Sequence, residues 1–107
     1  MSRPTIAALN DTFRKTFEGG RVLITANVSA LPPILVAEAL ERVRTFTDFT
    51  PDNDPYGEHN FGRFDLAGHK FLWKIDYYDK SMIHGSEDPA DPEQTTRVLT
   101  VMLAEDY

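Results

Sequence analysis

Apolar and polar residues alternate with a period of two over residues 60–78, on both sides of a short turn. A two-residue turn at Ala67 and Gly68 gives a β-hairpin in which one face of each strand is apolar. We assign these side chains to the buried face: Phe64, Leu66, Phe71, Trp73, Ile75 and Tyr77. The pattern thus predicts a hairpin with one face in the core.

The register of this hairpin is supported by charge as well as by hydrophobicity. It places Asp65 directly opposite Lys70 on the polar face, and such an opposite-charge pair stabilises antiparallel strands. It also places Trp73 opposite Gly62 on the apolar face. Because a glycine leaves room for a large neighbour, we expect Trp73 to be buried at this position.

Helical spacing predicts two helices before the hairpin. Apolar residues at intervals of three and four predict an amphipathic helix over residues 4–17, built on Ile6, Leu9, Phe13 and Phe17. The glycines at 19 and 20 end it. A second apolar stripe follows two prolines that suit a first helical turn, and comprises Val36, Leu40, Val43 and Phe46. Between the two helices, the β-branched residues 21–28 predict a strand that joins the hairpin.

The end of the chain carries helix-start signals. Asp91 suits an N-cap, Pro92 the first helical position and Gln94 the third, which together resemble a capping box. The expected buried stripe of this last helix is Val98, Leu99, Met102 and Leu103. The chain therefore predicts one α+β domain over residues 1–107, in the order α-β-α-β-β-α. Helices would cover one face of a three-stranded, mainly antiparallel sheet.

Charge is the most distinctive feature of the composition. The 107 residues include 17 acidic and 11 Lys or Arg side chains, for a net charge of −6 and a pI near 4.9. Such a chain is repelled by nucleic acids and anionic membranes and attracted to basic protein surfaces. Cysteine is absent, which excludes disulfides and thiolate catalysis. With no apolar run of membrane length, we expect a cytoplasmic protein without a direct nucleic-acid or membrane partner.

The segment 50–59 is predicted to be a loop, and it offers candidate ligands and acids in Asp52, Asp54, Glu58 and His59. Their spacing matches no calcium-binding loop, so we expect turn-capping carboxylates rather than a metal site. No nucleophile elbow or phosphate-binding glycine loop is present. We therefore assign no catalytic residue, no metal and no cofactor.

Two further groups are candidates for binding a partner. The first is a set of carboxylates near the predicted start of the last helix, namely Glu87, Asp88 and Glu93. The second lies on the polar face of the hairpin and is apolar, namely Phe61, Leu72 and Tyr78. Either a helix covers this second group or it forms a contact patch.

Three stretches resemble a bacterial, mainly alphaproteobacterial and often plasmid-borne family that carries a domain of unknown function. They are DNDPYGEHNFG at 52–62, FLWKIDYYD at 71–79 and DPADPEQTTRVLTVMLAEDY at 88–107. The resemblance implies no activity and no site residues. It implies a setting on mobile elements, where small acidic proteins often block nucleic-acid-processing machines.

These observations favour a non-enzymatic inhibitor of the anti-CRISPR or antirestriction type. Its acidic loops, with Asp52, Asp54 and Glu58, would dock on a basic protein surface such as a subunit of a CRISPR effector. A first alternative is a small metal-assisted hydrolase or metal-binding protein that uses residues 52–59. A second is a structural or regulatory homodimer that buries the apolar patch of the hairpin.

Overall fold

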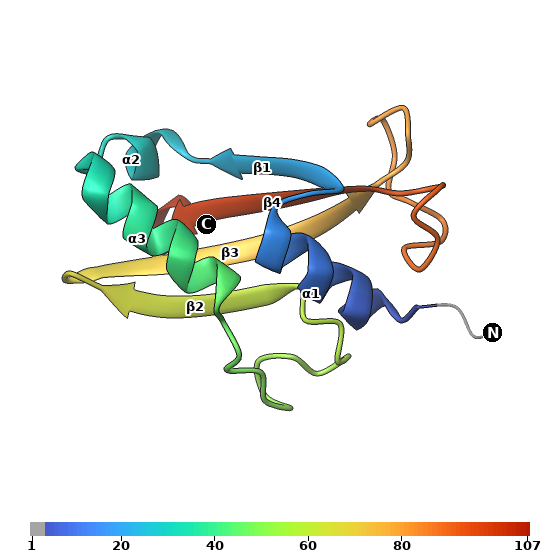
Figure 1. Ribbon diagram of the computed structural model, residues 1–107, viewed down its shortest axis with the longest axis horizontal. Helices are drawn as coiled ribbons and strands as arrows, with labels where there is room; N and C mark the ends of the chain where they lie inside the picture. Colours follow the sequence, from blue (N-terminus) through green and yellow to red (C-terminus); the bar gives the residue numbers. More distant parts are fainter. Residues whose placement is uncertain (1–3) are drawn as a thin grey trace.

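A computed structural model, which describes residues 4–107, shows a four-stranded sheet with helices packed on one face (Figure 1). The elements in chain order are α1 (Ile6–Thr16), β1 (Gly20–Ile24), α2 (Ala26–Ser29), α3 (Pro33–Arg44), β2 (Phe61–Leu66), β3 (His69–Tyr78), β4 (Thr96–Leu103) and the short 3₁₀ helix η1 (Ala104–Asp106). The α+β class predicted from the sequence is confirmed.

The hairpin is confirmed in its predicted register. Gly62 pairs with Trp73, and Asp65 pairs with Lys70. Trp73 is fully buried, and a Cβ atom added at Gly62 would collide with the indole ring. The missing side chain at Gly62 therefore makes the space that the tryptophan fills.

The predicted last helix is wrong, because this segment forms strand β4 instead. It lies in the middle of the sheet, whose order is β1-β4-β3-β2, antiparallel to β3 and parallel to β1. Both faces of β4 carry buried apolar side chains, so its sequence lacks the alternation of a half-exposed strand and also satisfies a helical spacing. The supposed cap, Asp91, closes a turn by accepting from the backbone N–H of Glu93. The sheet is therefore mixed and four-stranded, not three-stranded and mainly antiparallel.

The predicted strand over 21–28 extends four residues too far at its C-terminal end. It ends at Ile24, and the next residues form the short helix α2. The hydroxyl of Thr25 accepts from the N–H of Val28 as an N-cap, and Val28 is fully buried. Local side-chain capping outweighs β propensity here because it is combined with burial of an apolar residue.

The core lies between the sheet and the helices α1 and α3. Its centre is formed by Phe13, Val43, Phe71, Trp73, Leu99 and Val101. Neither α1 nor α3 covers the opposite face, so of the two alternatives for Phe61, Leu72 and Tyr78, cover by one of these helices is excluded. The C-terminal Tyr107 packs against Phe61, with ring centroids 6.5 Å apart. On this open face Leu72 is nevertheless buried, whereas Phe61 and Tyr78 are half-buried.

Candidate functional site

One face of α1 carries three polar side chains that reach into the structure: Asn10, Asp11 and Arg14. Asn10 and Arg14 are almost completely buried, with 0% and 1% of their surface exposed. Their spacing of four residues places them one turn apart on the same side of the helix. Because buried polar groups must be hydrogen-bonded, their partners determine what α1 holds in place.

Asn10 connects three separate segments. Its Nδ2 donates to the carbonyl oxygen of Glu58 at 2.9 Å and to the hydroxyl of Tyr77 at 2.8 Å. Its Oδ1 accepts from Nε of Arg97 at 2.7 Å. The Tyr77 hydroxyl in turn donates to Glu58 Oε1 at 3.0 Å. Burial, together with the negative charge of Glu58, raises the pKa of Tyr77, so the phenol stays protonated as a donor.

Arg97 extends this hydrogen-bond network from Asn10 to the loop between β3 and β4. Its Nη2 donates to the carbonyl oxygen of Pro89 at 2.5 Å, and its guanidinium lies over the ring of Tyr77, 5.3 Å from the centroid. Burial lowers the pKa of Arg97, although an arginine stays charged in proteins. A charged donor thus fixes the backbone of residues 86–91 to the core.

Arg14 holds the end of α3. Its Nε donates to the carbonyl oxygen of Val43 and its Nη2 to that of Phe46, both at 3.0 Å, while Nη1 pairs with Asp11 at 2.9 Å. The last carbonyls of a helix lack partners within the helix and carry partial negative charge, so an arginine stabilises them. This contact sets the direction in which the chain leaves α3 and enters the loop 47–60.

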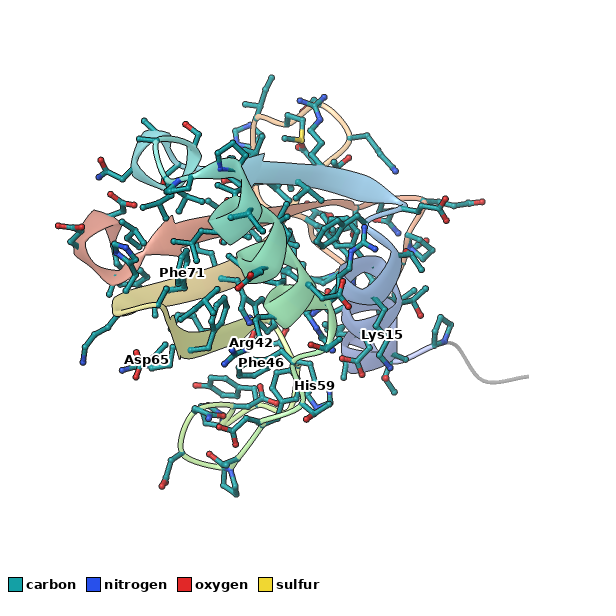
Figure 2. All side chains as sticks on the ribbon, turned by 60° about the vertical axis from the view of Figure 1, so that its left-hand side comes forward. Lys15, Arg42, Phe46, His59, Asp65 and Phe71 are labelled. Atoms are coloured by element: carbon teal, nitrogen blue, oxygen red, sulfur yellow. The ribbon has the colours of Figure 1, made fainter. Side chains whose placement is uncertain are left out.

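His59 attaches the other end of that loop to α1. Its Nδ1 lies 3.0 Å from both carboxylate oxygens of Asp11, its Nε2 lies 3.6 Å from Asp54, and its ring stacks on Phe49 with centroids 4.0 Å apart. Figure 2 shows His59 close to Phe46, where the loop passes below α3. His59 has a positive φ of 55°, a backbone conformation that is unfavourable for residues other than glycine. The contacts of its ring hold the residue in this conformation.

The charge of Asp11 is maintained by these contacts. Burial alone would raise its pKa, but hydrogen bonds from Arg14 and His59 and their positive charge lower it below the usual value of a carboxyl group. We call the set Asn10, Asp11, Arg14, Glu58, His59, Tyr77 and Arg97 the polar cluster. Its members bond mainly to one another and to backbone groups.

The polar cluster lies behind the two loops that contain most of the acidic residues. Loop 47–60 leads into β2 and loop 79–95 joins β3 to β4, and the antiparallel pairing of β2, β3 and β4 means that both loops connect at the same end of these strands. In Figure 1, loop 47–60 lies below β2, and loop 79–95 lies beyond the ends of β3 and β4. Together they hold nine of the 17 acidic side chains and a single Lys or Arg, Lys80. We call these two loops the acidic end.

The structure divides the predicted contact residues into two kinds. Asp52, Glu87 and Glu93 are exposed at the acidic end, and Asp88 is half-buried there. Asp54 instead has a side chain only 6% exposed, and it accepts from the backbone N–H groups of Glu58 and His59. The Asp54 and Glu58 carboxylates, both predicted to contact a partner, therefore help to hold their own loop.

Loop 79–95 is held by its own side chains as well. The Asp79 carboxylate accepts from the hydroxyl of Ser81 and from the N–H groups of Ile83 and His84, and these hydrogen bonds lower its pKa. Further along, the hydroxyl of Thr95 donates to the carbonyl oxygen of Asp88 at 2.9 Å. Both loops of the acidic end thus have defined conformations, as a preformed binding surface requires.

Four members of the polar cluster were not predicted from the sequence: Asn10, Asp11, Arg14 and Arg97. Asn10, Asp11 and Arg14 lie beside the apolar stripe of the first helix, where polar residues are usually exposed. Arg97 lies in the segment that was predicted as the last helix. Its side chain faces the helices only because this segment forms strand β4. The signal available in the sequence was the pair of polar residues Asn10 and Arg14, which flank the buried Phe13 at helical spacing.

Within residues 4–107, no group of three or more His, Asp or Glu side chains is arranged to hold a metal ion. The same part of the chain contains no helix that is long and apolar enough to cross a membrane.

Comparison with known proteins yields one match. No curated protein and no solved structure matches the chain. A family model described as protein of unknown function (DUF3768) matches residues 24–106, which include α2, α3, β2, β3 and β4. The chain therefore belongs to the DUF3768 family of proteins of unknown function.

Proposed function

We propose that this protein is a non-enzymatic inhibitor that docks its acidic end on a basic protein surface. The observation that carries the proposal is the concentration of nine acidic and one basic side chain on two loops at one end of the sheet. The expected target is a nucleic-acid-processing machine, as in anti-CRISPR or antirestriction proteins. A basic subunit of a CRISPR effector is an example.

In such a contact, the carboxylates of the inhibitor would compete with nucleic-acid phosphates for the Lys and Arg side chains of the target. A protein that binds nucleic acid neutralises phosphates with Lys and Arg, and carboxylates on a rigid scaffold compete for the same side chains. The polar cluster supports this role because it holds both loops before any partner binds, which reduces the ordering cost of association. The plasmid-borne setting implied by the sequence resemblance agrees with such an inhibitor.

The polar cluster itself supports a structural role better than a catalytic one. Asp11 and His59 are bonded to each other, and Glu58 and Tyr77 are bonded to each other and to Asn10. A general acid or base has to reach a substrate, whereas these groups are engaged in holding the loops. The alternative of a metal-assisted hydrolase is less well supported for the same reason, since Asp54 and His59 contact one another and the loop backbone.

The proposal is tested by a matched pair of variants. One neutralises exposed carboxylates of the acidic end: Asp52→Asn, Glu87→Gln and Glu93→Gln. The control neutralises three exposed carboxylates elsewhere: Glu38→Gln, Glu41→Gln and Glu105→Gln. Both variants change the net charge by the same amount, so only the position of the charges differs. Partners captured by the unmodified protein from a lysate of the source cells are identified by mass spectrometry and then measured against each variant.

We expect the acidic-end variant to lose at least about tenfold in affinity, equal to about 1.4 kcal/mol, and the control to lose much less. Raising salt from about 0.05 to 0.5 M shortens the Debye length from roughly 14 to 4 Å and should slow association. The captured partner should also release its nucleic acid when the inhibitor binds. Equal affinity losses in the two variants, together with salt-independent association, would show that the acidic end is not the contact.

An apolar contact would give a different result. Phe61 and Tyr78 are half-buried on the open face of the sheet, and replacing both with Ser removes apolar surface there without changing charge. Loss of binding in this variant alone, with a normal unfolding transition, would place the partner on the open face instead.

A further inference from the structure

Strand β1 forms one edge of the sheet and pairs with β4 alone (Figure 1). In a parallel ladder, alternate residues direct both backbone groups to the neighbouring strand. Just beyond the strand, Thr25 donates its N–H to the carbonyl oxygen of Val101, which sets the phase of this alternation. The backbone groups of Gly20, Val22 and Ile24 therefore point away from β4 and are available to another strand.

Strand β1 has little of the usual protection of an edge strand, since Arg21 is its one charged residue. Natural edge strands carry charges, prolines or bulges that prevent pairing with a second chain. Residues 22–37 contain no charged side chain, although the whole chain has 28 Asp, Glu, Lys and Arg residues. Within this uncharged segment Leu23, Ile24 and Ile34 are 51%, 37% and 73% exposed. Apart from Arg21, the edge strand is thus apolar, uncharged and open to pairing.

We propose that β1 pairs with β1 of a second copy of this chain, antiparallel about a two-fold axis through Val22. The outward backbone groups determine the register, in which Val22 lies opposite Val22 of the second copy and Gly20 opposite Ile24. On the open face, Leu23 then lies beside the long alkyl stem of Arg21 from the second copy. The two sheets become one continuous sheet of eight strands.

The outward backbone groups of this edge are self-complementary about a two-fold axis, and the charge distribution tolerates a second copy there. Two molecules that each carry −6 repel one another, and the uncharged segment 22–37 allows close approach with the least charge–charge contact. The acidic end lies beside the first residue of β1, because β1 runs parallel to β4. Antiparallel pairing therefore sends the two acidic ends to opposite ends of the dimer, whereas parallel pairing would bring them together.

Sedimentation velocity from about 1 to 100 µM tests the proposal, because a dimer appears with rising concentration. The unmodified chain should become dimeric, and the double variant Leu23→Lys, Ile24→Lys should remain monomeric. Tyr56→Lys is the control, since Tyr56 is 86% exposed on loop 47–60, away from β1. Lysine reduces the net negative charge, so a lost dimer cannot result from greater repulsion between the two net charges. In the proposed register, the lysine at position 23 would instead face Arg21 of the second copy and disrupt the pairing locally. An unmodified chain that stays monomeric, or a dimer that survives the double substitution, would overturn the proposal.

A cross-linking experiment tests the register without relying on an edge substitution that introduces charge. The natural chain has no cysteine, so a single introduced thiol reacts unambiguously. Val22→Cys should give a covalent dimer with a short bis-maleimide, because the two side chains face each other across the axis. Ala67→Cys, in the turn between β2 and β3 at the other edge, should remain monomeric. Equal cross-linking at both positions would contradict the proposed interface, as would a monomeric chain that binds only an extended peptide at β1.

Discussion

Replacing Asn10 with Leu tests whether the polar cluster holds the two loops of the acidic end. Leucine has the same branched shape and number of side-chain heavy atoms as asparagine, but its methyl groups are larger and neither donate nor accept a hydrogen bond. The substitution removes the contacts of Asn10 with the Glu58 carbonyl, the Tyr77 hydroxyl and Arg97 Nε. It leaves no cavity, so lost polar contacts and the tighter packing of the methyl groups determine the result.

The expected loss of stability follows from the groups left behind. A buried group that loses its hydrogen-bond partner costs about 1 to 3 kcal/mol, and more if it is charged. The Tyr77 hydroxyl keeps its bond to Glu58, and Arg97 keeps its bond to Pro89, so neither loses every partner. The Glu58 carbonyl loses its bond to Asn10, at about 1 to 3 kcal/mol, and the weakened contacts of Tyr77 and Arg97 add about 1 kcal/mol each. We therefore expect the free energy of unfolding to fall by about 3 to 5 kcal/mol, a large part of the 5 to 15 kcal/mol typical of a domain.

Urea unfolding followed by the fluorescence of Trp73 measures this loss, because Trp73 is the single tryptophan and is fully buried. Asn27→Ala is the control. Asn27 is also hydrogen-bonded, to Asp106, but on the exposed surface, so a change below about 1 kcal/mol is expected there. In the Asn10→Leu variant, amide hydrogen exchange should accelerate more in loops 47–60 and 79–95 than in β3. A loss below about 1 kcal/mol for Asn10→Leu, or unchanged exchange in the loops, would refute the reasoning.

Two further predictions concern the turn of the hairpin and the response to acid. Ala67 has a φ of 52°, so Ala67→Asn should raise the free energy of unfolding in urea by about 0.5 to 1 kcal/mol, since asparagine tolerates this region; a decrease would contradict this. The lowered pKa of Asp11 means that its ionised form stabilises the fold above the ordinary carboxyl value, near 3.9, and that this stabilisation disappears as pH falls through the lower folded value. The difference in the free energy of unfolding between Asp11→Asn and the unmodified chain should therefore shrink in acid. A difference that stays constant with pH would argue against a stabilising role for ionised Asp11.

The hairpin could be predicted in full because several local signals agree there. The alternation of apolar residues, the Ala67-Gly68 turn and the pairing of Asp65 with Lys70 all specify one register. Each of these signals lies within the hairpin and is independent of the rest of the chain. The burial of Trp73 against Gly62 then follows from the register alone.

Strand β4 could not be predicted by the same means. As a central strand its two faces are both buried, so apolar residues occur on both sides and its spacing is ambiguous between helix and strand. The helix-start residues at 91–94 favoured the wrong alternative, although in the structure they form a turn. What makes this segment a strand is the pairing with β1 and β3, which are distant in the sequence.

The loop over residues 50–59 was predicted correctly, but its individual carboxylates could not be sorted. Asp52 and Asp54 look equivalent in the sequence, yet Asp52 is exposed and Asp54 holds the backbone of its own loop. The difference arises from where α1 lies, because Asp11 and Asn10 fix the positions of His59 and Glu58. A contact between residues 48 positions apart is not contained in a local pattern.

The role of α1 leads to a prediction about the segment that the family model matches. Residues 24–106 supply many groups that α1 satisfies: the carbonyl oxygens of Val43 and Phe46 accept from Arg14, and Arg97 Nε donates to Asn10. Without α1 and β1, these groups lose partners, and the core loses Phe13, which is only 2% exposed.

We therefore expect a chain of residues 24–107 to lack a cooperative urea transition and the near-ultraviolet circular dichroism of a packed core. The loss of Phe13 alone accounts for about 3 to 5 kcal/mol, and the unpaired guanidinium and carbonyl groups add to it. A chain of residues 4–107 is the matched control, because it lacks only the three residues before the described structure. Cooperative unfolding of the shorter chain at a similar urea concentration would mean that the matched segment folds without α1, and that the polar cluster does not hold the fold together.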